Sequence, residues 1–257
     1  MQVKPPCSVR ARGFFIDFKF SFGYGETGDQ MNLKRDQMAE IIDHTLLKAT
    51  ASEKDILLLC EEAGMYGFGY VCVNPCWIKK AAAELSGTKT RICTVIGFPL
   101  GATTTLTKLG EATEAMHNGC SGVDLVINLG ALKSGYYRQV EEEIKAIADA
   151  VSAYHKDGHV KVIIETCYLS NQEKKDACLI ARNAGACFVK TSTGFGSAGA
   201  TVEDVTLIKS VIGQEMGIKA AGGIKTLAQA VAFVEAGATR LGTSSGIAII
   251  KEMDAAQ

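Results

Sequence analysis

Two lysines stand at matching positions in two copies of one pattern. Lys190 ends the apolar run 187–189 and is followed by the small residues 191–194, and Lys219 is followed in the same way by residues 220–223. A short apolar run of this kind predicts a buried parallel strand. Lysine is seldom fully buried without a partner, so each amine is either held in an ion pair or tuned for chemistry.

The chemistry open to such a pair is nucleophilic attack on a carbonyl group. Lysines at the ends of neighbouring parallel strands lie side by side at one mouth of the sheet. Like charges in a partly dry site disfavour protonation, so one amine can be neutral near pH 7 and can form a Schiff base. The alternative is a pair of ion-paired or snorkelling lysines without a catalytic role.

Carboxylates at other strand positions are candidates for proton transfer. Asp124 interrupts the apolar run 122–127 and needs a cationic partner there. Pairing with Lys219 would create a proton relay, whereas a core ion pair is the structural alternative. Asp43 either joins the same site or only orients a loop. Glu165, at the end of another strand, is expected to hold the network together and not to act as a base.

Two further side chains have mainly structural interpretations. Cys72 lies between two valines and is predicted to be a packed core thiol, although we place it with Asp43 and Thr193 among the residues that line the substrate site. Arg91 is predicted to be a solvated residue where a strand begins.

Glycine-rich loops follow the last predicted strands. Gly222 and Gly223 form one loop, and the run 242–245, which contains Ser244 and Ser245, forms the next before a helix. Glycines let backbone N–H groups approach a phosphate, and a helix N-terminus favours negative charge. Either loop alone could be a simple turn, but together they predict a phosphorylated ligand.

Composition limits the class of protein. The chain has 257 residues, 47% of them hydrophobic, and a net charge of -1, which argues against nucleic acid as a partner. No apolar run is long enough for a membrane span. Nine cysteines in apolar surroundings predict reduced thiols and a cytoplasmic protein. No spacing matches a zinc site, so we expect no metal.

Strand and helix patterns alternate along most of the chain, which predicts a single (β/α)8 barrel over residues 35–257. An open doubly wound sheet is the alternative. Residues 1–34 are predicted to be a poorly ordered extension. The strands are expected at 38–47, 70–73, 91–96, 123–127, 160–164, 187–190, around Lys219 and at 239–241. The helices are expected at 52–64, 77–85, 104–117, 137–154, 171–184, 202–212, 226–235 and after residue 246.

Five motifs resemble the deoxyribose-phosphate aldolase family, in the right order from about residue 36 to the C-terminus. They are IDHTLLK at 42–48, VIGFPLG at 95–101, GVDLVIN at 122–128, VKTSTGF at 189–195 and IKAAGGI at 218–224. The resemblance implies the (β/α)8 fold and a class I aldolase. Such an enzyme reversibly splits 2-deoxy-D-ribose 5-phosphate into D-glyceraldehyde 3-phosphate and acetaldehyde, in deoxyribose phosphate catabolism.

The resemblance also implies roles for individual residues. Lys190 is the Schiff-base lysine, Lys219 is the second lysine that keeps Lys190 deprotonated, and Asp124 is its partner in proton transfer. No cofactor is implied, and a homodimer is expected. The positions where the family contacts the substrate phosphate are Gly194, Gly223, Ser244 and Ser245.

Three other functions are compatible with the same residues. Another lysine aldolase or a transaldolase would use the same amine, and a phosphosugar isomerase would share the phosphate loops without a covalent intermediate. A phosphosugar-binding sensor that kept the pocket is a non-catalytic alternative.

Overall fold

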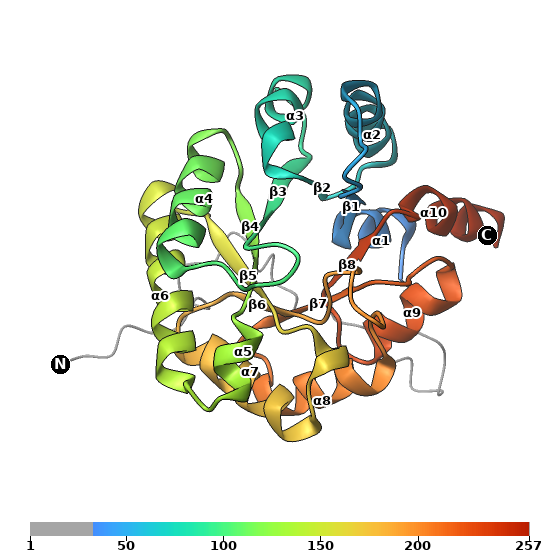
Figure 1. Ribbon diagram of the computed structural model, residues 1–257. Coiled ribbons are helices and arrows are strands. Elements are labelled where there is room, and N and C mark those ends of the chain that lie inside the picture. The colour runs from blue at the N-terminus through green and yellow to red at the C-terminus, as the bar shows by residue number, and fades with distance from the viewer. Residues whose placement is uncertain (1–32, 257) are drawn as a thin grey trace.

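The chain folds into a closed barrel of parallel strands (Figure 1). The structure is a computed structural model that describes residues 33–256. The strands pair in chain order, and β8 pairs with β1 to close the sheet. This closure confirms the predicted (β/α)8 barrel and excludes the open sheet. The strands are β1 (Ile42–Leu46), β2 (Tyr70–Val73), β3 (Arg91–Ile96), β4 (Gly122–Val126), β5 (His159–Ile163), β6 (Phe188–Lys190), β7 (Gly217–Ala221) and β8 (Arg240–Thr243).

Helices form a ring around the barrel (Figure 1). They connect the strands, as the alternating pattern predicted. Their bounds are α1 (Arg35–Ile41), α2 (Glu53–Tyr66), α3 (Ile78–Glu84), α4 (Thr105–His117), α5 (Leu129–Lys133), α6 (Tyr137–Tyr154), α7 (Asn171–Asn183), α8 (Val202–Ile212), α9 (Leu227–Glu235) and α10 (Gly246–Ala255), with the short 3-10 helices η2 (Pro75–Trp77) and η3 (Thr166–Tyr168).

The side-chain alternation of the strands separates the helix-facing core from the barrel interior. In β4, Val123 and Leu125 pack in the large apolar core, so Asp124 between them faces the interior. Other strands repeat the arrangement, with one charged residue between two apolar ones. The charged residues placed inside in this way include Lys161, between Val160 and Val162, and Lys219, between Ile218 and Ala220.

The predicted start of helix α2 is confirmed, and its predicted end is not. Its predicted N-cap, Ser52, accepts a hydrogen bond from the backbone N–H of Asp55 at 3.4 Å. The predicted end near Gly64 was wrong. The helix continues to Tyr66 and ends at Gly67, which adopts the left-handed conformation with φ of 74°.

Two of the described α-helices were not predicted. Residues 38–41, expected to begin the first strand, belong to α1, because buried Met38 and Ile41 are spaced as on one helical face. Helix α5 lies in the loop after β4 and is capped by the Asn128 side chain, which accepts from the N–H of Ala131 at 3.0 Å. The predicted extension 1–34 lies outside the described residues except for its last two, so the domain boundary stays a prediction.

Membrane and disulfide expectations have different outcomes. No helix among residues 33–256 is long and apolar enough to cross a membrane. Cys187 is disulfide-bonded, so the prediction of reduced thiols fails at that position. The described cysteines with free thiols are Cys60, Cys72, Cys76, Cys93, Cys120, Cys167 and Cys178.

Candidate active site

Lys190 and Lys219 bind the same oxygen of one aspartate. The two lysines are paired in register on the neighbouring strands β6 and β7. Their Nζ atoms donate to Oδ2 of Asp124 on β4 at 2.8 and 2.7 Å. The structure thus brings together the three residues that the sequence singled out as catalytic.

The charges of Asp124 and Lys219 are fixed by attraction between oppositely charged groups in a buried space. Burial opposes ionisation of Asp124, but Lys161, Lys190 and Lys219 together hold its pKa well below the usual range. Burial also opposes the charge on Lys219, but Asp124 and Asp43 raise its pKa well above the usual value. Asp124 is therefore a carboxylate and Lys219 an ammonium group.

Asp43 is part of the same interior network. Its Oδ1 accepts from Nε of Arg240 at 2.7 Å, and its Oδ2 lies 2.5 Å from Nζ of Lys219. Burial would raise its pKa, but Arg240, Lys219 and Lys161 bring it below the usual range. The carboxylate of Asp43 is therefore a second partner of Lys219 beside Asp124, so Asp43 joins the site and does not only orient a loop.

A third lysine was missed by the sequence interpretation. Lys161 on β5 is fully buried, and its Nζ lies 3.2 Å from Oδ1 of Asp124 and 3.9 Å from Oδ2 of Asp43. Burial would lower its pKa, but Asp124, Cys93 and Asp43 raise it. The available signal was a lysine placed between Val160 and Val162 in a strand predicted to be buried.

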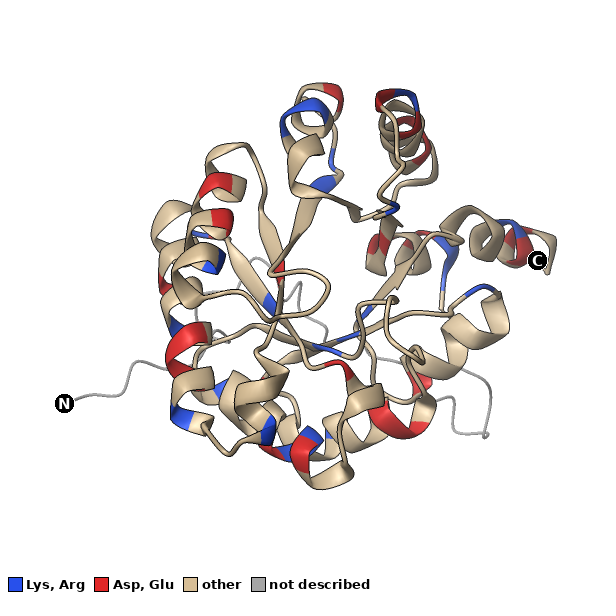
Figure 2. Cartoon of the chain, viewed as in Figure 1, with Lys and Arg blue, Asp and Glu red and all other residues tan. Residues whose placement is uncertain are grey.

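The interior carries more basic than acidic groups. Lys161, Lys190, Lys219 and Arg240 surround the two carboxylates Asp43 and Asp124, and all six residues are at most 6% exposed. Figure 2 shows basic segments on strands inside the ring of helices as well as on the helices. Four basic groups therefore face two carboxylates in this buried space.

Cys72 lies inside the barrel. It packs in a small interior cluster with Leu47, Tyr70, Cys93 and Val95. The thiol is packed, as predicted, but it faces the catalytic groups and not the helices. A hydrogen bond with Cys93 lowers its pKa against the effect of burial, and the charge of Lys219 lowers it further.

Glu165 anchors the loop that follows Lys190. Its carboxylate accepts from the backbone N–H of Thr193 at 3.1 and 3.3 Å and from the Thr193 hydroxyl. Glu165 adopts a positive φ of 49°, a strained conformation for a residue with a side chain. The interpretation of Glu165 as a residue that holds the network together agrees with these contacts.

The loops after β6, β7 and β8 are tied to one another. The N–H of Ala200 donates to the carbonyl oxygens of Ala221 and Gly222 at 3.1 and 3.2 Å. The Thr243 hydroxyl donates to the carbonyl of Ile224 at 2.6 Å and accepts from the N–H of Ser245 at 2.9 Å. Residues predicted to contact phosphate therefore lie on connected loops.

These loops can present backbone N–H groups to an anion. Gly194, Gly222 and Gly223 have φ values of 86°, 92° and 82°, which favour glycine. Ser244 is exposed, and Ser245 precedes α10 without forming a side-chain cap. The first N–H groups of α10 have no acceptor within the helix, so they can bind a phosphate group.

Comparison with known proteins identifies the family. The family model described as DeoC/LacD family aldolase matches residues 36–252. The chain belongs to this family. It is therefore an enzyme of the aldolase class, as the motifs implied.

Individual members of this aldolase family are also similar over most of their length. The deoxyribose-phosphate aldolase of Aciduliprofundum boonei is 55% identical over 85% of this chain and 97% of its own. That of Carboxydothermus hydrogenoformans is 54% identical over 84% of this chain and 94% of its own. The tetrameric deoxyribose phosphate aldolase of Aeropyrum pernix has a TM-score of 0.81 at 32% identity, covering 87% of this chain and 94% of its own.

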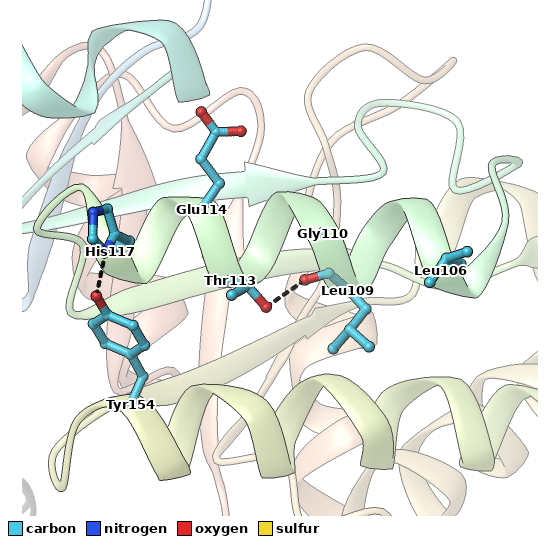
Figure 3. A pocket seen from close by; sticks show the side chains of 7 residues that line it. All are labelled: Leu106, Leu109, Gly110, Thr113, Glu114, His117 and Tyr154. Carbon is cyan, nitrogen blue, oxygen red and sulfur yellow. Dashed lines mark hydrogen bonds between the residues drawn. The ribbon is translucent and has the colours of Figure 1, made fainter.

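Two other features of this aldolase are the contacts of Arg91 and a surface pocket. Arg91 is not simply solvated as predicted: it pairs with Glu40 at 2.9 Å and lies over the ring of Tyr70 at 4.6 Å. A pocket on the outer surface involves α4 and Tyr154 of α6 (Figure 3). None of the predicted site residues lines it. The lining residues are Leu106, Leu109, Gly110, Thr113, Glu114, His117 and Tyr154.

Proposed function

We propose that this aldolase reversibly cleaves 2-deoxy-D-ribose 5-phosphate into D-glyceraldehyde 3-phosphate and acetaldehyde, with Lys190 forming a Schiff base. The observation that carries the proposal is the sharing of Asp124 Oδ2 by Lys190 and Lys219. This arrangement places an amine, a neighbouring fixed cation and a proton acceptor in one site. The names of relatives above 50% identity support the choice of substrate.

The first stage is imine formation at Lys190. Its neutral amine adds to the aldehyde carbon of the open-chain sugar and gives a carbinolamine, which loses water to form a protonated imine. Asp124, hydrogen-bonded to Lys190, exchanges the protons of these steps with Lys219 and water. The protonated imine then serves as the electron sink.

Carbon–carbon cleavage follows from that sink. Removal of the proton from the C3 hydroxyl lets the C2–C3 bond break, releases glyceraldehyde 3-phosphate and leaves an enamine on Lys190. Protonation of the enamine at C2 and hydrolysis of the imine release acetaldehyde and regenerate the amine. The phosphate binds to the connected loops that contain Gly194, Gly222, Gly223, Ser244 and Ser245. The rest of the substrate site is lined by Asp43, Cys72 and Thr193.

Borohydride trapping tests the covalent step. The full-length protein is reduced in the presence of 2-deoxyribose 5-phosphate or acetaldehyde, digested and mapped by mass spectrometry. The expected adduct is on Lys190 and is absent from Lys190→Ala. A folded, phosphate-binding protein that gives no adduct would reject the aldolase mechanism in favour of an isomerase or a sensor.

Product analysis tests the substrate assignment separately. Acetaldehyde release during turnover is expected from deoxyribose phosphate cleavage and not from a transaldolase or a ketose phosphate aldolase. Each proposed step uses protein groups and water. The homodimer and the cytoplasmic location stay predictions, and the Aeropyrum pernix relative is tetrameric.

A further inference from the structure

Two thiols and a carboxylate converge inside the barrel. Cys72 on β2 is paired in register with Cys93 on β3, and Asp124 lies on the next strand, β4. All three residues are fully buried. Their two sulfur atoms and a carboxylate oxygen lie within 4.8 Å of one another. Sulfur and oxygen donors this close form a possible ligand set for a metal ion.

The inward direction of both thiols is a consequence of the strand alternation. Cys72 and Cys93 pack in the interior cluster, whereas Val71, Val73 and Ile92 pack in the helix-facing core. Zinc lies about 2.3 Å from thiolate sulfur and about 2.0–2.2 Å from carboxylate oxygen. Tetrahedral ligands at those distances lie between about 3 and 4 Å apart. Donor atoms within 4.8 Å of one another must therefore move closer together to bind one ion, and the Cys93 thiol must leave the Asp43 carboxylate oxygen to which it donates at 3.7 Å.

The surrounding charges select the kind of ion. Lys161, Lys190 and Lys219 all lie near Asp124, so a divalent cation added alone would be repelled. A thiophilic ion that displaces the protons of two thiols leaves the net charge of the interior unchanged. Magnesium and calcium prefer oxygen ligands and do not displace thiol protons in this way. The site therefore favours ions with high affinity for thiolate.

We propose that Cys72, Cys93 and Asp124 form an inhibitory site for a thiophilic divalent cation such as Zn²⁺ or Cd²⁺. Ligation would take Asp124 from its contacts with Lys190 and Lys219, and the proposed proton transfers would stop. The ligands come from three strands far apart in the sequence, so motif spacing does not reveal them. The inhibition by the ion rests on the proposed function, because it requires the cleavage reaction. The binding of the ion does not depend on that reaction.

Cadmium titration tests binding without reference to activity. The full-length protein, reduced and freed of metal by a chelator, is titrated with Cd²⁺ while the ultraviolet thiolate-to-cadmium absorption is recorded. Cys93→Ala and Cys93→Ser are expected to lose one tight equivalent of Cd²⁺. Cys178→Ala is the matched control, because Cys178 is a buried free thiol on α7 in the helix-facing core. Binding by both Cys93 variants that equals that of the unmodified protein would overturn the proposal.

Zinc inhibition of the cleavage reaction tests the consequence. The unmodified protein and Cys178→Ala are expected to lose activity with Zn²⁺ and to recover it when a chelator is added. The Cys93 variants should stay active without Zn²⁺ and need about tenfold more Zn²⁺ or higher for half inhibition. Equal inhibition of all variants would reject the site. Absence of cleavage activity would reject the proposed function, and the cadmium result would still decide ion binding.

Discussion

Lys161 and Asp124 stand directly opposite each other on β5 and β4, with Nζ of the lysine 3.2 Å from Oδ1 of the aspartate. Lys190 and Lys219 occupy the other oxygen, Oδ2. Both oxygens of Asp124 are therefore next to an ammonium group. We infer that Lys161 is a positioning residue, because it fixes the orientation of the carboxylate that faces the proposed Schiff-base amine.

Replacing Lys161 by methionine is expected to lower kcat about tenfold or more, equivalent to about 1.4 kcal/mol of activation free energy. Asp124 would lose the cation at Oδ1 and could turn away from Lys190. KM should change much less, and borohydride should still trap substrate on Lys190. Lys174→Met is the matched control, since it removes an ion pair with Asp204 that lies outside the barrel. Full kcat in folded Lys161→Met would exclude this role.

Replacing Lys219 by leucine tests the electrostatic role of the second lysine. Lys219 stays protonated because Asp124 and Asp43 raise its pKa well above the usual value, so it places a fixed positive charge beside Lys190. Without that charge, protonation of the neighbouring amine becomes easier. The rate should fall strongly, and the acidic limb of the kcat/KM profile should move to higher pH. An unchanged rate and profile would remove this role from Lys219.

Local patterns were sufficient for most elements, and long-range geometry was required for the remainder. Apolar runs ending in polar residues predicted strands such as 70–73 and 91–96, whose bounds the structure reproduces. Helix α1 was missed because its apolar residues Met38, Ala39 and Ile41 lead directly into the apolar start of β1 at Ile42. The sequence therefore predicted the order of the strands and helices of the barrel, but it assigned residues 38–41 to a strand when they belong to a helix.

In the site, too, local patterns revealed some residues and only the folded barrel revealed others. Lys190, Lys219 and Asp124 were recognised because each breaks an apolar strand near a distinctive motif. Lys161 breaks a strand in the same way, but nothing local indicates that β5 places it opposite Asp124. Arg240 was missed for a similar reason, since its partner Asp43 lies at the other end of the chain and meets it only when β8 closes on β1. Barrel closure creates these pairs.

Adding a negative charge beside α10 tests the phosphate site. Ser244 is exposed in the loop before that helix, so Ser244→Asp should be tolerated by the fold. The carboxylate would repel the substrate phosphate and compete for the same N–H groups. KM for 2-deoxyribose 5-phosphate should rise about tenfold or more, and activity on unphosphorylated 2-deoxyribose should change little. Ser244→Asn is the uncharged control. Equal losses on both substrates would place the phosphate elsewhere.

His159 is expected to make the barrel less stable in mild acid. It is buried against Tyr70 and Phe188, and burial together with the charges of Lys161 and Arg240 lowers its pKa well below the usual value. In the unfolded chain its pKa is about 6.5, so below that pH the unfolded state takes up a proton that the folded state does not. This histidine therefore supports stability above about pH 6.5 and withdraws that support as the pH falls toward its folded-state pKa.

The size of this effect follows from the same linkage. At about pH 5.5, one unit below the unfolded pKa, His159 should reduce the free energy of unfolding by about 1.4 kcal/mol relative to neutral pH. Urea unfolding of the unmodified protein and of His159→Gln at about pH 7.5 and about pH 5.5 measures it. The variant should lose less stability between the two pH values, whatever its stability at either one. His155→Gln, at an exposed position, is the control and should follow the unmodified protein. An equal loss in His159→Gln would show that His159 takes up its proton in the folded barrel.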